Sequence, residues 1–294
     1  MMNKFFWKEF SSVKESIISE IVFGNLSLRH KSYIKELIGT AEALLGRNSI
    51  DSVILFGSVA HDFVSPMSDI DILIIANNSI SSKKIKSVEP ILTTIEIKHK
   101  FAEYHYDPLS QIIQIVNRNT GMFCSHFICR HQAWEEKNFA KIFSTSSGLT
   151  KMLAPNKIVL DSMRAGARVI YGNANIANHQ TPISHRQLIK SMLMNLILWS
   201  GTILLIPWNQ KFMKYFLEAY KWSLKSCSYT LFRYIRPLHT IISNYERIGE
   251  TGDFVMRFRS LRQNLHIDLG FALSVPYHVI KMHGIAMRYL NDLD

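Results

Sequence analysis

The chain has 294 residues, of which 47% are hydrophobic and 19% are charged, a globular composition with room for two domains and a sizeable core. Its three cysteines are too few for a disulfide framework, so a reducing, cytoplasmic compartment is expected. The amphipathic first 23 residues contain three glutamates and no continuous apolar core, and we therefore do not expect a signal peptide.

The formal net charge of +11 lies almost entirely in the second half of the chain. Residues 1–150 contain 16 Lys and Arg against 15 Asp and Glu, whereas residues 151–294 contain 18 against 8. A positive field of this size attracts anions such as nucleic acid, a nucleoside triphosphate or an acidic partner. A solvated basic surface without a partner gives the same pattern.

In chain order, the first half of the sequence alternates between helical and strand-like patterns. Strands are predicted where β-branched residues cluster or alternate, and helices where apolar residues recur every three to four positions. The predicted helices span residues 4–23, 28–45, 82–88 and 107–118, and the predicted strands span residues 53–56, 69–75, 92–99 and 122–129.

From about residue 146 onward the pattern is helical, and glycines and prolines separate the segments. Residues 191–206 are mostly apolar, but polar residues interrupt them and the run is short for a membrane span. A buried core helix is therefore favoured over a membrane helix. The predicted helices span residues 157–171, 185–206, 210–235, 238–248, 254–265 and 279–291.

Two short motifs in the first half point to phosphate and metal chemistry. Gly57-Ser58 follows a buried strand and is predicted to form a tight turn whose backbone N–H groups can bind phosphate oxygens. In Asp69-Ile70-Asp71-Ile72, the strand period of two places both aspartates on one face and both isoleucines in the core. Neighbouring carboxylates repel each other without a cation, and Mg²⁺ is a cation that prefers oxygen ligands.

Gly57-Ser58, ten intervening residues and Asp69-Ile70-Asp71 together resemble the signature of the DNA polymerase β-like nucleotidyltransferase superfamily. The clear resemblance covers about residues 50–100. Members share a small mixed sheet flanked by helices, and they use two Mg²⁺ ions to transfer a nucleotidyl group from an NTP to a hydroxyl or similar acceptor. The resemblance therefore implies two Mg²⁺ ions as cofactors and an NTP such as ATP as substrate.

The fold expected from the patterns and the resemblance is α+β, with a small mixed nucleotidyltransferase sheet followed by an all-helical C-terminal domain. Residues 1–27 are predicted to form an N-terminal helix. The nucleotidyltransferase catalytic domain is predicted at residues 28–145, and the helical domain at residues 146–294.

The resemblance also implies roles for individual residues. Gly57 and Ser58 would bind the β- and γ-phosphates of the NTP, and Ser68 would donate a hydrogen bond to phosphate. Asp69 and Asp71 would ligate both metal ions. Such a site transfers a nucleotidyl group by in-line displacement, with the metal ions stabilising the attacking and the leaving oxygen.

A third acid on a neighbouring strand would ligate the metal at the acceptor hydroxyl or act as general base. Glu96 fits this role best, because it lies between two isoleucines in the predicted strand at residues 92–99. Glu103 is the alternative if residues 83–99 form one long helix. Pro90 argues against that helix, because proline removes a backbone hydrogen bond.

Two other features have non-catalytic explanations. The cysteines and histidines of residues 124–131 are zinc-ligand types, but their spacing is tight for one tetrahedral site, which favours core cysteines with exposed histidines. Cations and aromatic residues interleave over residues 211–234, a pattern that suits RNA binding. At helical spacing, however, such aromatic residues are more often core residues with solvated lysines around them.

The function expected is Mg²⁺-dependent transfer of an NMP from an NTP to an acceptor hydroxyl. Aminoglycoside-modifying members of the superfamily have a similar size, but their polycationic acceptors do not suit a basic C-terminal half. An anionic acceptor such as RNA is therefore favoured, a protein or small-molecule acceptor is left open, and no membrane partner is expected. The alternative is a non-catalytic nucleotide- or RNA-binding protein that retains the fold.

Overall fold

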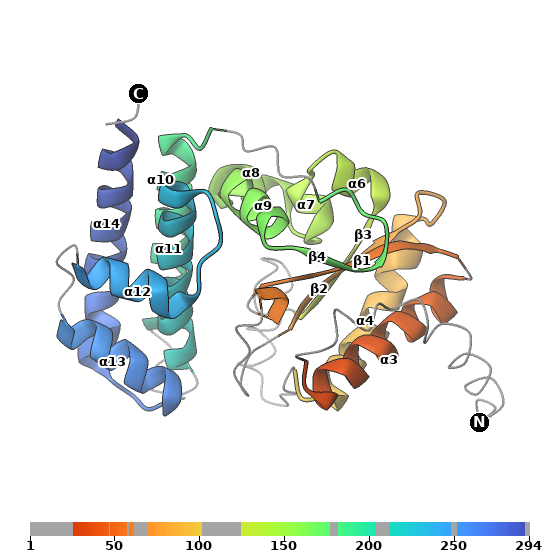
Figure 1. The fold of residues 1–294 in the computed structure, drawn as a ribbon, viewed down its shortest axis with the longest axis horizontal. Helices are drawn as coiled ribbons and strands as arrows, with labels where there is room; N and C mark the ends of the chain where they lie inside the picture. Colours follow the sequence, from red (N-terminus) through yellow and green to blue (C-terminus); the bar gives the residue numbers. More distant parts are fainter. Residues whose placement is uncertain are drawn as a thin grey trace. The chain divides into compact units, whose positions relative to one another are not determined.

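The computed structural model divides the chain into two compact units, residues 1–147 with 163–177 and residues 148–162 with 178–294. The first unit contains the β-sheet and the second is helical (Figure 1). The predicted domain boundary between residues 145 and 146 stays a prediction. The residues that the structure describes are 26–46, 48–57, 59–61, 70–101, 125–176, 182–203, 212–247 and 252–291.

The first unit is built on a four-stranded mixed sheet with the strand order β3-β2-β1-β4 (Figure 1). β1 (Ile50–Phe56) pairs antiparallel with β2 (Asp71–Ala76), and β2 pairs parallel with β3 (His126–Arg130). β4 (Arg168–Gly172) pairs antiparallel with β1 on its other side. The small mixed sheet and the strands at residues 53–56 and 69–75 are thereby confirmed, with ends that differ by up to three residues.

Two helices, α3 (Leu28–Leu45) and α4 (Ser82–Lys98), lie together on one side of this sheet (Figure 1). Each begins at a serine whose side chain accepts a hydrogen bond from a backbone N–H of the first turn, Ser27 in α3 and Ser81 in α4. Their apolar stripes form one core cluster with β1 and β2. The helix predicted at residues 28–45 is confirmed at both ends.

On the other side of the sheet lie α6 (His131–Glu135) and α7 (Phe139–Ile142), which follow β3 (Figure 1). Phe127 of β3 makes an edge-to-face contact with Phe143, with ring centroids 4.9 Å apart. Both faces of the sheet are therefore covered along part of their length.

The prediction of a strand at residues 92–99 was wrong, because residues 92–98 belong to α4 and His99 is its C-cap. A window of eight residues rich in threonine and isoleucine fits a strand, but the buried side chains recur every three or four positions, as in a helix. Pro90 is exposed inside α4 and does not end the helix. The buried apolar side chains of α4 are Ile85, Val88, Leu92 and Ile95.

The prediction of one helix at residues 157–171 was also wrong. α9 (Asn156–Ala165) ends at Gly166, and the chain then forms β4, the edge strand beside β1. Gly172 closes this strand with φ of +69°, and a Cβ atom there would overlap the carbonyl oxygen of Asp51. The backbones of β4 and β1 can approach this closely because residue 172 has no side chain.

The second unit is a helical assembly in which α10, α11 and α14 pack together. Two buried polar residues of α10 are paired with residues of its neighbours: Asn195 donates to Ser223 of α11 (2.8 Å), and Ser191 contacts His283 of α14 (3.2 Å). This pairing agrees with a core helix, and no described helix is long and apolar enough to cross a membrane. The helices are α8 (Ser147–Leu153), α10 (His185–Ile203), α11 (Met213–Phe232), α12 (Leu238–Arg247), α13 (Gly252–Gln263) and α14 (Leu269–Asn291).

The aromatic residues of α11 belong mainly to the core of this unit. Tyr220 is buried and makes edge-to-face contacts with Phe254 and Phe258 of α13. Lys221 is paired with Glu218 of its own helix. The core explanation for the aromatic pattern of residues 211–234 is therefore favoured over an RNA-binding face. The helices predicted at residues 4–23 and 107–118 lie outside the described residues.

The assignment of residues 82–98 to one helix predicts that Pro90→Ala stabilises the protein. Alanine restores the backbone N–H and removes the ring from an exposed position, so the free energy of unfolding should rise by roughly 1–3 kcal/mol. Pro237→Ala is the control, because Pro237 is half-buried and lies just before the first residue of α12 (Leu238–Arg247), where proline removes no helical hydrogen bond, so the stability should change little. Urea unfolding of both variants measures this, and a stability loss in Pro90→Ala alone would contradict the helix.

Candidate active site

The predicted phosphate-binding turn and the predicted metal-binding strand meet at one end of the β1–β2 pair. Phe56 is the cross-strand partner of Asp71, so Gly57 lies directly against the Asp71 side chain. Gly57 has φ of +75°, and a Cβ atom added there would overlap Oδ2 of Asp71. Both the backbone angle and the close approach therefore require glycine at this position. The arrangement sets a turn backbone beside a carboxylate.

The alternation predicted for the metal-binding motif is confirmed where the structure describes it. Ile70 and Ile72 are fully buried in the core formed with α3 and α4. Asp71 lies between them in sequence, points to the opposite face of the sheet and is half-buried. The carboxylate is thus on the side of the sheet away from α3 and α4.

Glu96 was predicted to lie on a strand next to this motif, and the structure places it on α4 instead. Its carboxylate is buried, and Oε1 accepts hydrogen bonds from the backbone N of Ser125 and from Nδ1 of His126, both at 2.8 Å. Glu96 therefore binds the beginning of β3.

The sheet separates Glu96 from Asp71. His126 is the register partner of Ile72 on β3, so its side chain lies on the same face as Ile72, the face covered by α4. Glu96 reaches His126 on that face. Asp71 is adjacent to Ile72 on β2, so its side chain lies on the opposite face of the sheet. The structure brings Gly57 and Asp71 together and does not bring Glu96 to them.

The position beside Asp71 on the neighbouring strand is occupied by Ser125. The register pairs Ile72 with His126, so the preceding residues of the two strands, Asp71 and Ser125, lie side by side on one face. In the described part of the chain, no three His, Cys, Asp or Glu side chains gather into a group that could hold a metal ion. Of the predicted metal ligands, the structure describes Asp71 and Glu96, and of these two Asp71 lies beside Gly57.

Residues 40–127 match the family model described as "Polymerase beta, Nucleotidyltransferase", and this range includes Gly57, Asp71 and the strands that carry them. The chain contains a nucleotidyltransferase domain of the polymerase β-like superfamily. No curated protein matches the chain in sequence.

The fold of the whole chain is similar to a solved structure with the description "Crystal structure of spectinomycin adenyltransferase AAD(9) from Enterococcus faecialis with ATP and spectinomycin". The TM-score is 0.51 at 12% identity, and the match covers 85% of this chain and 98% of that chain. At this identity the similarity concerns the fold. It agrees with a nucleotidyltransferase domain followed by a helical C-terminal region.

Four of the site residues predicted from the sequence lie outside the described residues: Ser58, Ser68, Asp69 and the alternative acid Glu103. Their roles stay predictions. The described part of the candidate site consists of Gly57 and Asp71, with Ser125 beside Asp71.

The cysteines and histidines considered for zinc have other roles in the described structure. Cys129 is buried on β3, and this burial raises the pKa of its thiol to about 12, so it is not a ready thiolate ligand. His126 contacts Glu96, and His131 lies 3.1 Å from an Asp51 oxygen. Cys124 lies outside the described residues. The core interpretation of Cys129 is confirmed, whereas His126 is buried and was expected to be exposed.

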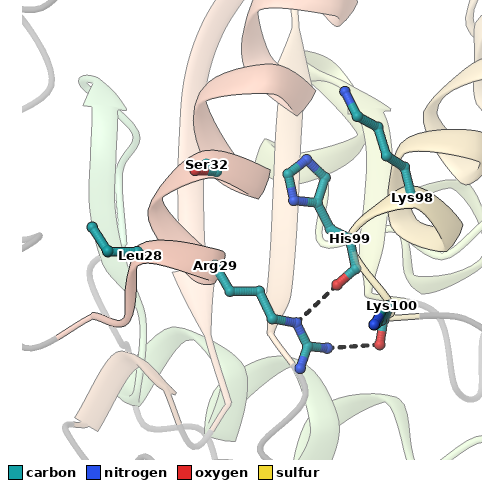
Figure 2. A pocket seen from close by; sticks show the side chains of 6 residues that line it. All are labelled: Leu28, Arg29, Ser32, Lys98, His99 and Lys100. Atoms are coloured by element: carbon teal, nitrogen blue, oxygen red, sulfur yellow. Dashed lines mark hydrogen bonds between the residues drawn. The ribbon is translucent and has the colours of Figure 1, made fainter.

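A surface pocket of about 420 Å³ lies away from the nucleotidyltransferase site, between the start of α3 and the end of α4 (Figure 2). Arg29 closes one side by donating to the carbonyl oxygens of His99 (2.8 Å) and Lys100 (2.6 Å). These bonds cap the C-terminal end of α4. The pocket belongs to the helical layer on the face opposite Asp71, and we assign it no part in the site.

The contact between Gly57 and Asp71 predicts that Gly57→Ala damages the site more than the backbone angle alone explains. The positive φ costs about 1–2 kcal/mol for alanine, and the added methyl group must also displace the Asp71 carboxylate. We expect lower stability and loss of Mg²⁺-dependent nucleotide binding, measured by urea unfolding and by titration with a fluorescent ATP analogue.

Gly46→Ala is the matched control, because Gly46 also has a positive φ (+116°) but a Cβ atom there has open space around it. It should lose stability without losing nucleotide binding. Equal nucleotide binding by the two variants would contradict the placement of the site at Gly57 and Asp71.

Proposed function

We propose that the protein is a Mg²⁺-dependent nucleotidyltransferase that moves an NMP from an NTP, such as ATP, to an acceptor hydroxyl. The observation that carries this proposal is the close fit of the Gly57 turn against Asp71 within the range that matches the nucleotidyltransferase family. A turn backbone supplies N–H groups for phosphate oxygens, and a carboxylate beside it supplies a ligand for the accompanying cation.

The proposed metal ligands are Asp71 and Asp69. Asp69 precedes Asp71 by two residues, so in a continued strand it lies on the same face, and Ser58 and Ser68 add phosphate contacts. When bound, Mg²⁺ ions stabilise the attacking acceptor oxygen and the leaving pyrophosphate oxygen. The chain's own contribution is to hold the triphosphate at the Gly57 turn with its charged oxygens directed toward Asp71.

For the third acid we propose Glu103. The alternative considered from the sequence depended on residues 83–99 forming one helix, and α4 spans residues 82–98. Glu96 is engaged with Ser125 and His126 on the other side of the sheet and is left out of the metal ligand set.

For the acceptor we propose an anion, with RNA as the first candidate. The C-terminal half has the strong positive balance described above, and the long helices α10 and α14 contain no Asp or Glu between them. Such a surface repels a polycation and attracts a polyanion. The similar solved structure contains spectinomycin, so a small-molecule acceptor is the second candidate for this chain.

A non-catalytic nucleotide-binding protein is the second candidate function. It is favoured by the serine at position 125, because the strand next to Asp71 supplies no acid there. Both candidates predict NTP binding, and only the enzyme predicts transfer of the α-phosphate.

The test is transfer of label from α-³²P-labelled NTPs in the presence of Mg²⁺, offered in parallel to cell RNA, to cell protein and to spectinomycin. We expect labelled RNA with the wild-type protein, and a loss of about 10²- to 10³-fold in Asp69→Asn and Asp71→Asn. Glu103→Gln should lose activity to a similar degree.

Asp253→Asn is the control, because Asp253 is an exposed acid of α13 that pairs only at the surface with Arg257. It should transfer at the wild-type rate. Transfer that survives in Asp71→Asn would contradict the metal site, and NTP binding without transfer to any acceptor would favour the non-catalytic candidate.

A further inference from the structure

We infer that Glu96 and His126 are positioning residues of the nucleotidyltransferase site, which fix the start of β3 and thereby the backbone of β2 at Asp71. The inference rests on the proposed function, because it concerns how precisely the metal-binding carboxylate is held. It gives Glu96 a role different from the metal ligand that its sequence context suggests.

The first step is the contact between α4 and β3. Glu96 is 5% exposed, and its Oε1 atom accepts both the N–H of Ser125 and the Nδ1 atom of His126. Both partners use the same oxygen, so one atom of α4 holds two consecutive residues at the point where β3 begins. Ser125 and His126 are 4% and 5% exposed, and water does not compete for these bonds.

The second step leads from β3 to the site. The carbonyl oxygen of Ser125 accepts a hydrogen bond from the backbone N of Ile72 at 2.9 Å. Ser125 is therefore bound at its N–H by Glu96 and at its C=O by Ile72, the residue that follows Asp71. A continuous path of hydrogen bonds joins the Glu96 carboxylate to the β2 backbone next to Asp71.

The third step is the surroundings of this path. Glu96 follows Ile95 and lies one turn after Leu92, and both of these side chains are buried in the apolar layer between α4 and the sheet. A carboxylate in such a layer costs free energy unless its hydrogen bonds are made. If this position served packing alone, an apolar residue would fit it better. The carboxylate is explained by its hydrogen bonds to the start of β3.

The consequence concerns the geometry of Asp71. Gly57 approaches Asp71 so closely that no side chain fits between them, and a shift of β2 therefore changes the distance from the carboxylate to the phosphate-binding turn. A misplacement of about 1 Å in a catalytic site can cost on the order of 10²-fold in rate.

The test compares two substitutions at position 96. Glu96→Gln keeps an oxygen that can accept both hydrogen bonds, whereas Glu96→Ala removes the acceptor. We expect Glu96→Gln to retain kcat within about threefold and the wild-type KM for NTP, and Glu96→Ala to lose roughly 10²-fold in kcat and to raise the KM for NTP about tenfold. The Mg²⁺ concentration for half-maximal activity should be unchanged in Glu96→Gln.

The matched controls are Glu89→Gln and Glu89→Ala, two turns earlier on α4, which should both behave as wild type. A Glu96→Gln variant as inactive as Asp71→Asn, with a raised Mg²⁺ requirement, would overturn the inference and make Glu96 a metal ligand. Full activity in a folded Glu96→Ala variant would also overturn it.

His126 gives a second route if Glu96→Ala does not fold. His126→Ala removes one of the two donors and leaves the Ser125 bond, so we expect a loss of about tenfold in kcat, with rescue by His126→Asn through its amide donor. Equal activity of His126→Ala and wild type would contradict the positioning role.

Mg²⁺-dependent binding of a fluorescent ATP analogue separates failure of this inference from failure of the proposed function. If the wild-type protein transfers no NMP, the proposed function is wrong, and the positioning role is decided by binding. About tenfold weaker binding in Glu96→Ala, with wild-type binding in Glu96→Gln, then supports positioning. Equal binding in both variants overturns it.

Discussion

The close approach of Gly57 to Asp71 is the constraint on which the candidate site depends. Pairing of Phe56 with Asp71 brings the turn at the end of β1 to the first residue of β2, and only glycine fits the backbone angle and the space. The strand register alone thereby brings the backbone proposed to bind phosphate and the carboxylate proposed to bind metal side by side. Longer-range packing is then needed at this point only to maintain the register between β1 and β2.

The two faces of the sheet have different roles: one packs against the core and the other carries the candidate site. Ile70 and Ile72 on one face belong to the core with α3 and α4, while Asp71 on the other face remains half-buried. Because strand side chains alternate between the two faces, three consecutive residues place the candidate ligand Asp71 on one face and two core isoleucines on the other. Glu96 is the polar exception in the core layer, and its bonds to Ser125 and His126 connect α4 to the strand end beside Asp71.

The sequence predicted those parts of the fold whose signals are complete within a short window. The helix at 28–45 has a serine cap, a buried stripe and a terminal glycine. The Gly57 motif lies within a single turn, and the Asp71 motif lies at the start of a single strand. The strand prediction for residues 92–99 was wrong because a window of eight residues fits both the strand period of two and the helical period of about 3.6. The buried helical stripe becomes apparent only when the window begins at Ile85. The sequence did not predict β4, because an edge strand of five residues depends on pairing with β1, which lies more than a hundred residues earlier in the chain.

A crystal structure with Mn²⁺ and a non-hydrolysable NTP analogue tests the central claim most directly, because anomalous scattering locates each metal ion. The account predicts Mn²⁺ coordinated by Asp71, with the triphosphate on the backbone of the Gly57 turn, and no ion at Glu96, which keeps its bonds to Ser125 and His126. A metal ion bound by Glu96, or a triphosphate bound away from Gly57 with no ion at Asp71, would contradict it.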